Sequence, residues 1–513
     1  MSERVVGIDL GTTNSVVAFV NDTGVAEAIP DEDGARITPS AVQLQADGDP
    51  VVGALARQMA VVEPDRVAQA FKRGMGERTF LPDERAFTVD GKTWSPEELS
   101  AVVLKKLRQV AERHFGESVT KAVITVPAYF GDAERKATIA AGEIAGLDVL
   151  SIINEPTAAA IAHGLDSGGE TGLVLVFDLG GGTLDVTVME VSTGGALNVR
   201  STGGDHQFGG VDFDQMILDR MDETVRDEAG AALSENPYAL QDAKAKAEEI
   251  KKELSTKASS TRPLTGAGRP VMFTLTRGEF EQMLADHLAE IDDHVLHAIE
   301  EAGLTPQQID TVLMVGGSAR IPAFRERLQK LVGKEPQFTR NLDEDVARGA
   351  ALMAAKTSNT ADPRSQLARM PAPVDVASHG LGVTTSRSQN PVDLYNSLLI
   401  PAGTPVPARQ EETFLTMHDG QRQLLLTLNE GDSDDLDLVQ ELGESVGDFR
   451  KPVGRNHPVR VVVEYTDQQL IRASAFDGET SEFLCNIEVK PEGVIDDEAK
   501  RQAMRYLSKI DVG

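Results

Sequence analysis

Two short turns that each follow an aspartate constrain the fold of this chain most strongly. Residues 6–15 read VGIDLGTTNS, and residues 175–184 read LVFDLGGGTL. In each segment an apolar run typical of a β-strand ends in a glycine-containing turn, and a second apolar run follows. Asp9 and Asp178 lie 169 residues apart, which is too far for a solenoid repeat. We therefore expect a duplicated domain with two facing halves.

The residues of these turns indicate phosphate binding. A phosphate approaches the backbone closely only where no Cβ intervenes, and successive N–H groups in a tight turn attract an anion. Hydroxyls and carboxylates that could bind phosphate and a hydrated Mg²⁺ flank the glycines: Thr12, Thr13, Thr183, Asp9, Asp178 and Asp185. One such turn is more often only a hairpin, but two matching turns, with a third in VGGSARIP (315–322), favour a nucleotide. The chain has neither a Walker A loop nor a Rossmann GxGxxG at the start of a helix.

Length and composition exclude several classes of protein. A chain of 513 residues is too long for one hydrophobic core, so we expect at least two domains. The apolar runs are far shorter than the roughly 20 residues that span a bilayer, and no signal peptide is expected at residues 1–9. The single cysteine, Cys485, indicates a reducing, cytoplasmic setting. A net charge of −31 argues against nucleic-acid binding.

The order of the predicted elements divides the chain. A helix is expected from Pro96, with Ser95 as its N-cap and Glu98 closing a capping box. A buried strand over 122–130 precedes a helix that Asp132 is expected to cap, and 211–300 is predicted to be mainly helical. We predict an α/β domain over 1–357, a linker over 358–374, a β domain over 375–493 and a short helix or tail over 494–513.

Several of these segments closely resemble the seventy-kilodalton heat-shock chaperones. The resemblance rests on GIDLGTTNSVVA, AVITVPAYFGDAERKATIAAGEIAGL, IINEPTAAAIAHGL, FDLGGGTLDV, GGVDFD and VGGSARIP, and it runs almost continuously over 4–356. It implies an actin- and hexokinase-like ATPase domain of two ribonuclease-H-like lobes, followed by a small β-sandwich. It also implies slow hydrolysis of ATP to ADP and phosphate, with Mg²⁺ and K⁺ as cofactors.

The resemblance assigns roles to individual residues. Lys72 is similar to the lysine that positions the attacking water, with Glu155, Asp178 and Thr183 as further catalytic residues. Asp9, Asp178 and Asp185 would face the metal, largely through water. Residues implied to bind the nucleotide are Gly11, Thr12, Thr13, Asn14, Gly180, Gly181, Gly182, Gly209, Gly210, Glu248, Lys251, Lys252, Ser255, Gly316, Gly317, Ser318, Arg320 and Asp343. Pro127 and Arg135 match the relay between the nucleotide and the second domain.

Without the resemblance, two of these assignments would be different. Lys72 would be an ordinary surface lysine, because one cation in a loop indicates nothing about catalysis. Residues 248–255 would form a solvated helix with i,i+4 charge pairs.

Three departures from the family lie beyond residue 357. Pro373 has no N–H for strand pairing and stands where the family has an apolar docking segment, so docking of the linker is expected to suffer. Few residues follow Gly493, so we expect no helical lid and fast exchange of weakly bound peptide. Ser386 and Gln423 align with apolar residues of the peptide groove, which predicts a more polar groove.

Three functions fit the sequence. The leading one is an ATP-dependent chaperone that binds unfolded polypeptides, with J-domain co-chaperones and nucleotide-exchange factors as further implied partners and neither nucleic acid nor membrane among them. The second is an ATP-driven switch that binds few partners. The third is a metabolite kinase of the same fold. Lys72 and residues 374–490 argue against it, because phosphate transfer to a small molecule does not require a β-sandwich domain.

Overall fold

The computed structural model describes residues 4–46, 48–77, 79–81, 86–166, 171–192, 195–266, 269–361, 366–387, 393–489 and 495–513. Two sheets, one of six strands and one of five, share the same five-strand order at the centre of the first 357 residues. The first has the order β11–β10–β1–β2–β3, and the second has the order β18–β17–β12–β13–β14. In each, a parallel strand pairs with the first strand of an antiparallel meander. The predicted duplication is therefore present in the topology.

The bounds of these strands follow the glycine turns. The first sheet contains β1 (Val5–Leu10), β2 (Asn14–Val20), β3 (Ala26–Ala28), β10 (Lys121–Val126) and β11 (Asp148–Asn154), with β4 (Thr38–Pro39) paired to β2. The second contains β12 (Gly172–Leu179), β13 (Leu184–Val191), β14 (Leu197–Asp205), β17 (Thr311–Val315) and β18 (Gln337–Phe338). Leu10 pairs with Ser15 and Leu179 with Leu184, so the two hairpins have the same loop length.

Two helices pack between the sheets. They are α4 (Glu155–Asp166) and α10 (Asp345–Thr357), and their alanines share one apolar cluster with residues of both sheets. A Cβ at Gly349 would lie 1.9 Å from the backbone oxygen of Ala158, so glycine is required at this crossing. Each lobe has its own further core, one built on α2 (Pro96–Phe115) and the other on α5 (Gly210–Ala229) and α6 (Pro237–Leu254).

The helix starts agree only partly with the prediction. Ser95 and Glu98 form the expected capping box at the start of α2. Asp132 does not cap α3 (Asp132–Ile144), because it is the first residue of the helix and Gly131 occupies the N-cap position. Its Oδ1 instead accepts the N–H of Ile471 from the β-sandwich, at 2.8 Å.

The remaining elements of the two lobes are short or peripheral. Small sheets are formed by β5 (Ala41–Gln43), β6 (Val51–Val52) and β7 (Val67–Gln69), by β8 (Thr88–Val89) and β9 (Lys92–Thr93), and by β15 (Ser259–Gly266) and β16 (Arg269–Thr276). Further helices of the lobes are α1 (Ala54–Met59), α7 (Arg277–Met283), α8 (Ala285–Glu301) and α9 (Pro322–Val332), with 3-10 turns at Pro64–Arg66, Phe71–Gly74, Leu233–Glu235, Pro306–Gln308 and Gly317–Arg320. Helix α11 (Gln366–Arg369) lies in the segment before the sandwich, and a 3-10 turn at Leu436–Leu438 lies within the sandwich. The hairpin of β15 and β16 interrupts the region that was predicted to be mainly helical.

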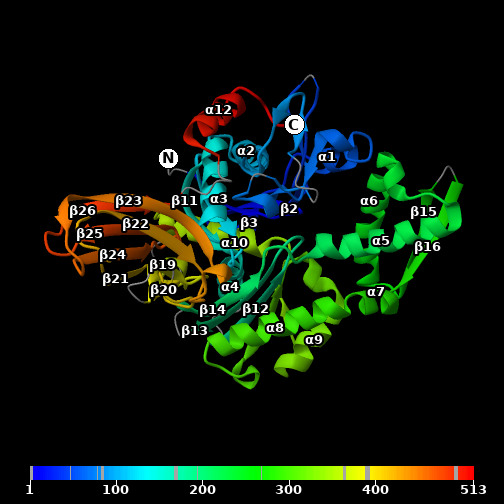
Figure 1. The fold of residues 1–513 in the computed structure, drawn as a ribbon. Helices are drawn as coiled ribbons and strands as arrows, with labels where there is room; N and C mark the ends of the chain where they lie inside the picture. The colour runs from blue at the N-terminus through cyan, green and yellow to red at the C-terminus, as the bar shows by residue number, and fades with distance from the viewer. Residues whose placement is uncertain are drawn as a thin grey trace.

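Two four-strand antiparallel sheets form the β-sandwich. One has the order β20–β19–β22–β23 and the other β21–β24–β25–β26, and their inner faces share one core. The strands are β19 (Leu381–Ser386), β20 (Leu394–Ile400), β21 (Ala408–Leu415), β22 (Gln421–Glu430), β23 (Gln440–Val453), β24 (Pro458–Tyr465), β25 (Ile471–Asp477) and β26 (Phe483–Glu488). Figure 1 shows the sandwich against the side of the molecule formed by α3, α4 and β14.

The segment before the sandwich docks on the second lobe, although Pro373 was expected to hinder this. The N–H of Val374 donates to Leu197 O and its carbonyl accepts from Val199 N–H, both at 2.9 Å. In a parallel bridge, only every second residue forms hydrogen bonds with the partner strand. Val374 forms both bonds here, so the missing N–H of Pro373 costs no hydrogen bond. The side chains of Leu367 and Met370 are buried in the cluster between the lobes.

The C-terminal segment packs on the first lobe. Helix α12 (Asp497–Leu507) lies beside α2 and α3 (Figure 1), and Ala503, Leu507 and Val512 are buried in the same core as α2. The backbone of Gly513 pairs with β6, since Val52 N–H donates to Gly513 O at 2.9 Å. The predicted boundary between 493 and 494 lies outside the described residues. Across the described ranges, no helix has the length and apolar character needed to cross a membrane.

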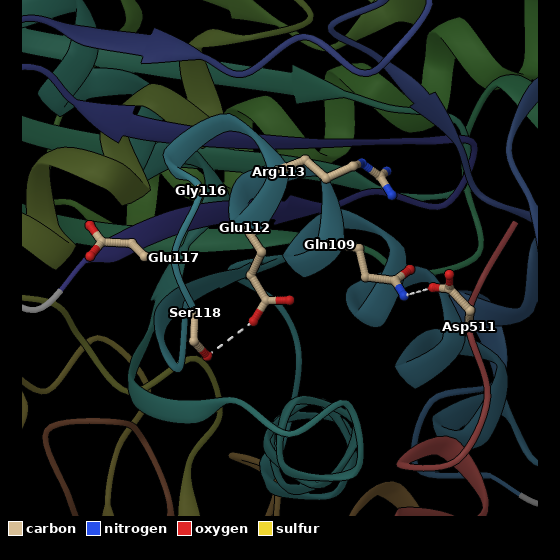
Figure 2. Close-up of a pocket in the computed structure, with 7 residues that line it drawn as sticks. All are labelled: Gln109, Glu112, Arg113, Gly116, Glu117, Ser118 and Asp511. Atoms are coloured by element: carbon tan, nitrogen blue, oxygen red, sulfur yellow. Dashed lines mark hydrogen bonds between the residues drawn. The ribbon is translucent and has the colours of Figure 1, made fainter.

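An open depression lies where this segment meets the end of α2. It has a volume of about 590 Å³, and Figure 2 shows Gln109 facing Asp511 on one side and Ser118 facing Glu112 on the other. None of the residues predicted to bind nucleotide lines it. The residues predicted to bind phosphate lie at the two glycine hairpins instead.

Candidate functional site

The two glycine hairpins meet face to face. A Cβ added at Gly181 would lie 2.0 Å from the Oγ1 of Thr13, and one at Gly182 would lie 2.7 Å from the Cγ2 of Thr12. The register of each hairpin places its aspartate two residues before the turn, and Asp178 pairs directly with Asp185 across β12 and β13. The structure thus brings the predicted phosphate-binding turns together from two separate sheets.

The third glycine turn and the start of α5 close around the second hairpin. Gly316 has φ of +83°, and a Cβ there would lie 2.4 Å from Leu179 O. The hydroxyl of Ser318 donates to Gly180 O at 2.7 Å. Gly210 N–H donates to the same Gly180 O at 3.1 Å. These contacts fix the shape of the 180–183 turn, with Gly209 and Gly317 beside them.

Lys72 and Glu155 form a buried ion pair. Lys72 Nζ donates to Glu155 Oε1 at 2.6 Å, and the two residues are only 3% and 8% exposed. Lys72 belongs to the 3-10 turn Phe71–Gly74, whereas Glu155 begins α4, so tertiary structure alone joins them. Nζ also lies 5.6 Å from the centre of the Phe130 ring. A buried lysine that keeps an acidic partner is suited to a charged reaction centre.

The predicted catalytic and metal-side carboxylates form one buried cluster. Burial raises the pKa of Asp9 to about 7, and the charge of Glu155 adds to the rise. Burial likewise raises the pKa of Asp185 to about 7 and that of Asp178 well above its usual range, with Glu155 again the next cause. Lys72 opposes all three shifts. The cluster thus contains four carboxyl groups, counting Glu155, and one lysine. A bound divalent cation would balance the excess negative charge.

Individual atoms of this cluster fit a hydrated cation. Oδ2 of Asp185 is buried and has no hydrogen-bond partner among the described residues, whereas its Oδ1 accepts from Tyr129 N–H at 3.1 Å. Asp9 Oδ1 accepts from the hydroxyl of Thr125 at 3.0 Å. No group of three or more His, Cys, Asp or Glu within the described ranges is spaced to hold a metal directly. Oxygen ligands that act through water suit Mg²⁺.

The residues predicted to bind the adenosine lie on the other side of the second hairpin. Lys251 Nζ donates to Gly210 O at 2.6 Å and to Asp214 Oδ2 at 2.8 Å. One helical turn earlier, Glu248 lies 2.7 Å from Lys252 Nζ. Arg320 and Asp343 form a two-pronged pair at 2.9 and 2.8 Å. Ser255 donates to Lys251 O at 3.3 Å.

A cleft of about 1290 Å³ opens between the lobes at this site. Thr12, Thr13 and Glu248 line it, together with residues that the sequence did not indicate. Two of these are arginines that bridge the lobes: Arg57 pairs with Glu248, and Arg73 Nη1 lies 3.0 Å from Asp212 Oδ1. Arg73 directly follows Lys72, but nothing in a single sequence distinguishes it from a surface arginine.

The predicted relay residues lie between the site and the β-sandwich. Arg135 is 2% exposed and donates to Phe130 O at 2.8 Å and to Asn154 Oδ1 at 2.9 Å. Asn154 in turn donates to Asp375 Oδ2 at 2.6 Å, at the start of the sandwich. Pro127 begins the turn that Arg135 holds, since its carbonyl accepts from Phe130 N–H at 3.3 Å. Asn154 and Asp375 were not predicted, because their role depends on the docked geometry.

Comparison with known proteins agrees with this arrangement. The family described as Hsp70 protein matches residues 5–506. Proteins named "Chaperone protein DnaK" from Thermotoga neapolitana, Thermotoga petrophila and Thermotoga maritima are each 40% identical to the chain over 437 residues. The aligned segment covers 84% of this chain and 71% of each relative. The fold is accordingly that of a duplicated actin-like ATPase domain with a β-sandwich, and the chain belongs to the Hsp70 family.

Proposed function

We propose that this chain is an ATP-dependent molecular chaperone. ATP binding and hydrolysis between the two lobes would control how the β-sandwich binds unfolded polypeptide segments. The observation that carries the proposal is the meeting of Gly181 and Thr13 from two hairpins beside the buried pair of Lys72 and Glu155. The name of the relatives supports the chaperone part.

The chain's own residues would perform the hydrolysis by positioning and charge. Backbone N–H groups of the two turns would bind the phosphates from opposite sides, where glycines leave room for them. Mg²⁺ would neutralise phosphate oxygens when bound, held through water by Asp9, Asp178 and Asp185. Lys72 would offset the charge that develops on the transferred phosphoryl group, and Glu155 would orient Lys72. Thr183 would add its hydroxyl at the end of the second turn.

The docked interface offers a route from the site to the sandwich. Arg135 holds the turn after β10, and Asn154 links Arg135 to Asp375. A nucleotide that favours one arrangement of this turn would shift the population of docked molecules by its difference in affinity for the two states. Binding of K⁺, of J-domain co-chaperones and of exchange factors, and a cytoplasmic location, belong to the same proposal.

One observation favours the narrower function of an ATP-driven switch with few partners. The described sandwich is attached to the first 357 residues at both ends, through Val374 on β14 and through Val489, whose carbonyl accepts from Lys136 Nζ at 2.7 Å. Residues 495–513 then pack on the first lobe. A sandwich held at two points moves less freely than one held by a single linker.

Steady-state ATP turnover distinguishes these functions. Wild type and Lys72→Ala are each measured with and without a permanently unfolded polypeptide, such as reduced and carboxymethylated lactalbumin. If the protein is a chaperone, hydrolysis should be slow, should require Lys72 and should be accelerated by the polypeptide. Hydrolysis without any response to the polypeptide would favour the switch. Transfer of phosphate to a small molecule in place of water would overturn both and identify a kinase.

A further inference from the structure

The arginine that follows Lys72 reaches across the cleft between the two lobes. Arg73 lies in the 3-10 turn Phe71–Gly74 of the first lobe, and Asp212 lies in α5 of the second lobe. Arg73 Nη1 donates to Asp212 Oδ1 at 3.0 Å, and Nη2 donates to Oδ2 at 3.3 Å. Both side chains are partly buried. A two-pronged pair of this kind fixes the direction of approach as well as the distance.

The carboxylate of Asp212 is itself held beside the second glycine turn. Its Oδ2 accepts from Gly209 N–H at 2.8 Å. The next residue along α5, Val211, donates its N–H to Gly181 O at 2.7 Å. Asp212 therefore has a set position relative to the turn at 180–183. A group of the first lobe that binds Asp212 is placed against that turn.

The side chain of Arg73 runs along the same turn. A Cβ at Gly182 would lie 3.1 Å from the Cγ of Arg73. Arg73 N–H donates to Ala70 O at 3.1 Å, and Ala70 has a φ of +55°, in the left-handed region. A residue with a Cβ keeps this conformation only where the surrounding contacts fix it. Lys72 thus belongs to a constrained turn, and the contact of Arg73 with Asp212 constrains that turn from the second lobe.

We propose that Arg73 is a positioning residue for ATP hydrolysis, which acts through Asp212 to hold Lys72 at a set distance from the 180–183 turn. Lys72 comes from the first lobe, whereas the second lobe supplies part of the phosphate site on which Lys72 would act. A small relative shift of the lobes would move Nζ away from the charge that develops during hydrolysis. A shift of about 1 Å can slow a reaction about a hundredfold. This inference rests on the proposed function.

The test removes each side of the pair alone and both sides together. Arg73→Gln removes the positive charge. Asp212→Asn removes the negative charge but keeps an oxygen for Gly209 N–H, so the start of α5 stays capped. The double variant Arg73→Gln/Asp212→Asn has neither charge. Arg73→Lys keeps a positive charge without the two-pronged geometry.

The control changes an arginine pair that lies within one lobe. Arg327 of α9 donates through Nε to Asp292 Oδ1 of α8 at 2.7 Å, and through Nη2 to Oδ2. Arg327→Gln therefore removes the same kind of contact without altering the cleft. For each full-length protein, rapid quench measures the rate of single-turnover ATP hydrolysis, and calorimetry measures the affinity for ATP.

The expected results separate the rate from the affinity. Arg73→Gln and Asp212→Asn should each slow hydrolysis about thirtyfold, because Lys72 is no longer held in place. Their affinity for ATP should match wild type, which also shows that the site is folded. The double variant should be no slower than the slower single variant, since both changes act on one contact. Arg73→Lys should recover part of the rate, and Arg327→Gln should hydrolyse ATP as wild type does.

Other outcomes would overturn the proposal. A wild-type rate in Arg73→Gln would show that hydrolysis does not need the pair, and an equal loss in Arg327→Gln would show that the effect is not specific to the cleft. Losses that multiply in the double variant would show that Arg73 acts without Asp212, as a direct contact with phosphate would. A loss of affinity with an unchanged rate would make the pair a binding contact. A wild-type protein that does not hydrolyse ATP would instead contradict the proposed function itself.

Discussion

Lys72 Nζ lies 2.6 Å from Glu155 Oε1, and this contact joins a 3-10 turn of the first lobe to the start of the helix between the lobes. Neither residue has a second oppositely charged partner at hydrogen-bond distance among the described residues. Burial is the largest cause of the raised pKa of Asp9, and the pair acts on the same carboxyl, because Glu155 raises that pKa further and Lys72 lowers it. Changing either member should therefore alter the whole cluster.

Glu155→Gln should slow single-turnover ATP hydrolysis about a hundredfold, because the amide no longer orients Lys72 through its charge. ATP binding should persist, since the phosphate-binding turns are unchanged. Glu190→Gln makes the same substitution on an exposed pair with Arg200 and serves as the control. Rapid quench measures hydrolysis and calorimetry measures binding. Wild-type hydrolysis in Glu155→Gln would contradict the catalytic assignment.

Gly181→Ala should reduce ATP affinity at least about tenfold, because its Cβ would lie 2.0 Å from Thr13 Oγ1 and one hairpin must move. Gly203→Ala is the matched control, since its Cβ would meet no atom within 4 Å. Thr13→Ala in the same molecule removes the closest atom and should restore part of the affinity. Calorimetric titration with ATP measures all four proteins. Equal affinities of Gly181→Ala and Gly203→Ala would show that the turns need not approach so closely.

The docked interface should weaken as the pH rises, because two carboxylates meet there. A Cβ at Gly131 would lie 2.9 Å from Glu430 Oε2 and 3.2 Å from Glu134 Oε2, so both crowd the same point. Burial, followed by the charges of Glu134 and Asp132, raises the pKa of Glu430 from 4.5 to about 8, and Arg135 opposes the rise. The docked state therefore binds a proton more tightly than the undocked state, and its stability is lost as the pH rises from about 4.5 through 8.

Hydrogen exchange at the Ile471 amide measures this dependence. The protection of wild type relative to Glu430→Gln should fall as the pH rises between those values, since glutamine cannot ionise. The ratio of the two Ile471 exchange rates removes the intrinsic effect of pH on exchange, because that effect is the same in both proteins. A ratio that does not change with pH would contradict the prediction.

Leu507→Asp should detach the C-terminal segment from the first lobe. Leu507 is 1% exposed in the core of α2, and an unpaired carboxylate there would cost on the order of several kcal/mol. Met504→Asp changes a half-exposed residue of the same helix and should leave the segment in place.

Fluorescence can follow the detachment. Trp94 is the only tryptophan of the chain, and its ring lies 5.8 Å from that of Tyr506 in an edge-on contact. Its emission should shift to the red in Leu507→Asp, because Tyr506 no longer covers it. An unchanged spectrum together with unchanged thermal stability would contradict the packing of α12 on this lobe.

Much of the fold could be read from the sequence because it depends on local rules. The strands around Asp9 and Asp178, the capping box at Ser95 and the switch to β runs after 374 all follow from alternation and turn chemistry. Asp132 shows where such rules fail. Its place at the start of a helix predicted that it caps the helix, but its Oδ1 accepts a hydrogen bond from Ile471 N–H of the docked sandwich instead.

The sequence by itself determined the glycine turns, their duplication and the family, because residue type and spacing carry that information. Only the tertiary structure decided which charges meet. The contact of Lys72 with Glu155, the bridge of Arg73 to Asp212 and the packing of His379 on Tyr129 each join segments far apart in the chain. No local pattern marks such partners, because burial and opposite charge become visible only when the lobes, the sandwich and the C-terminal segment are packed together.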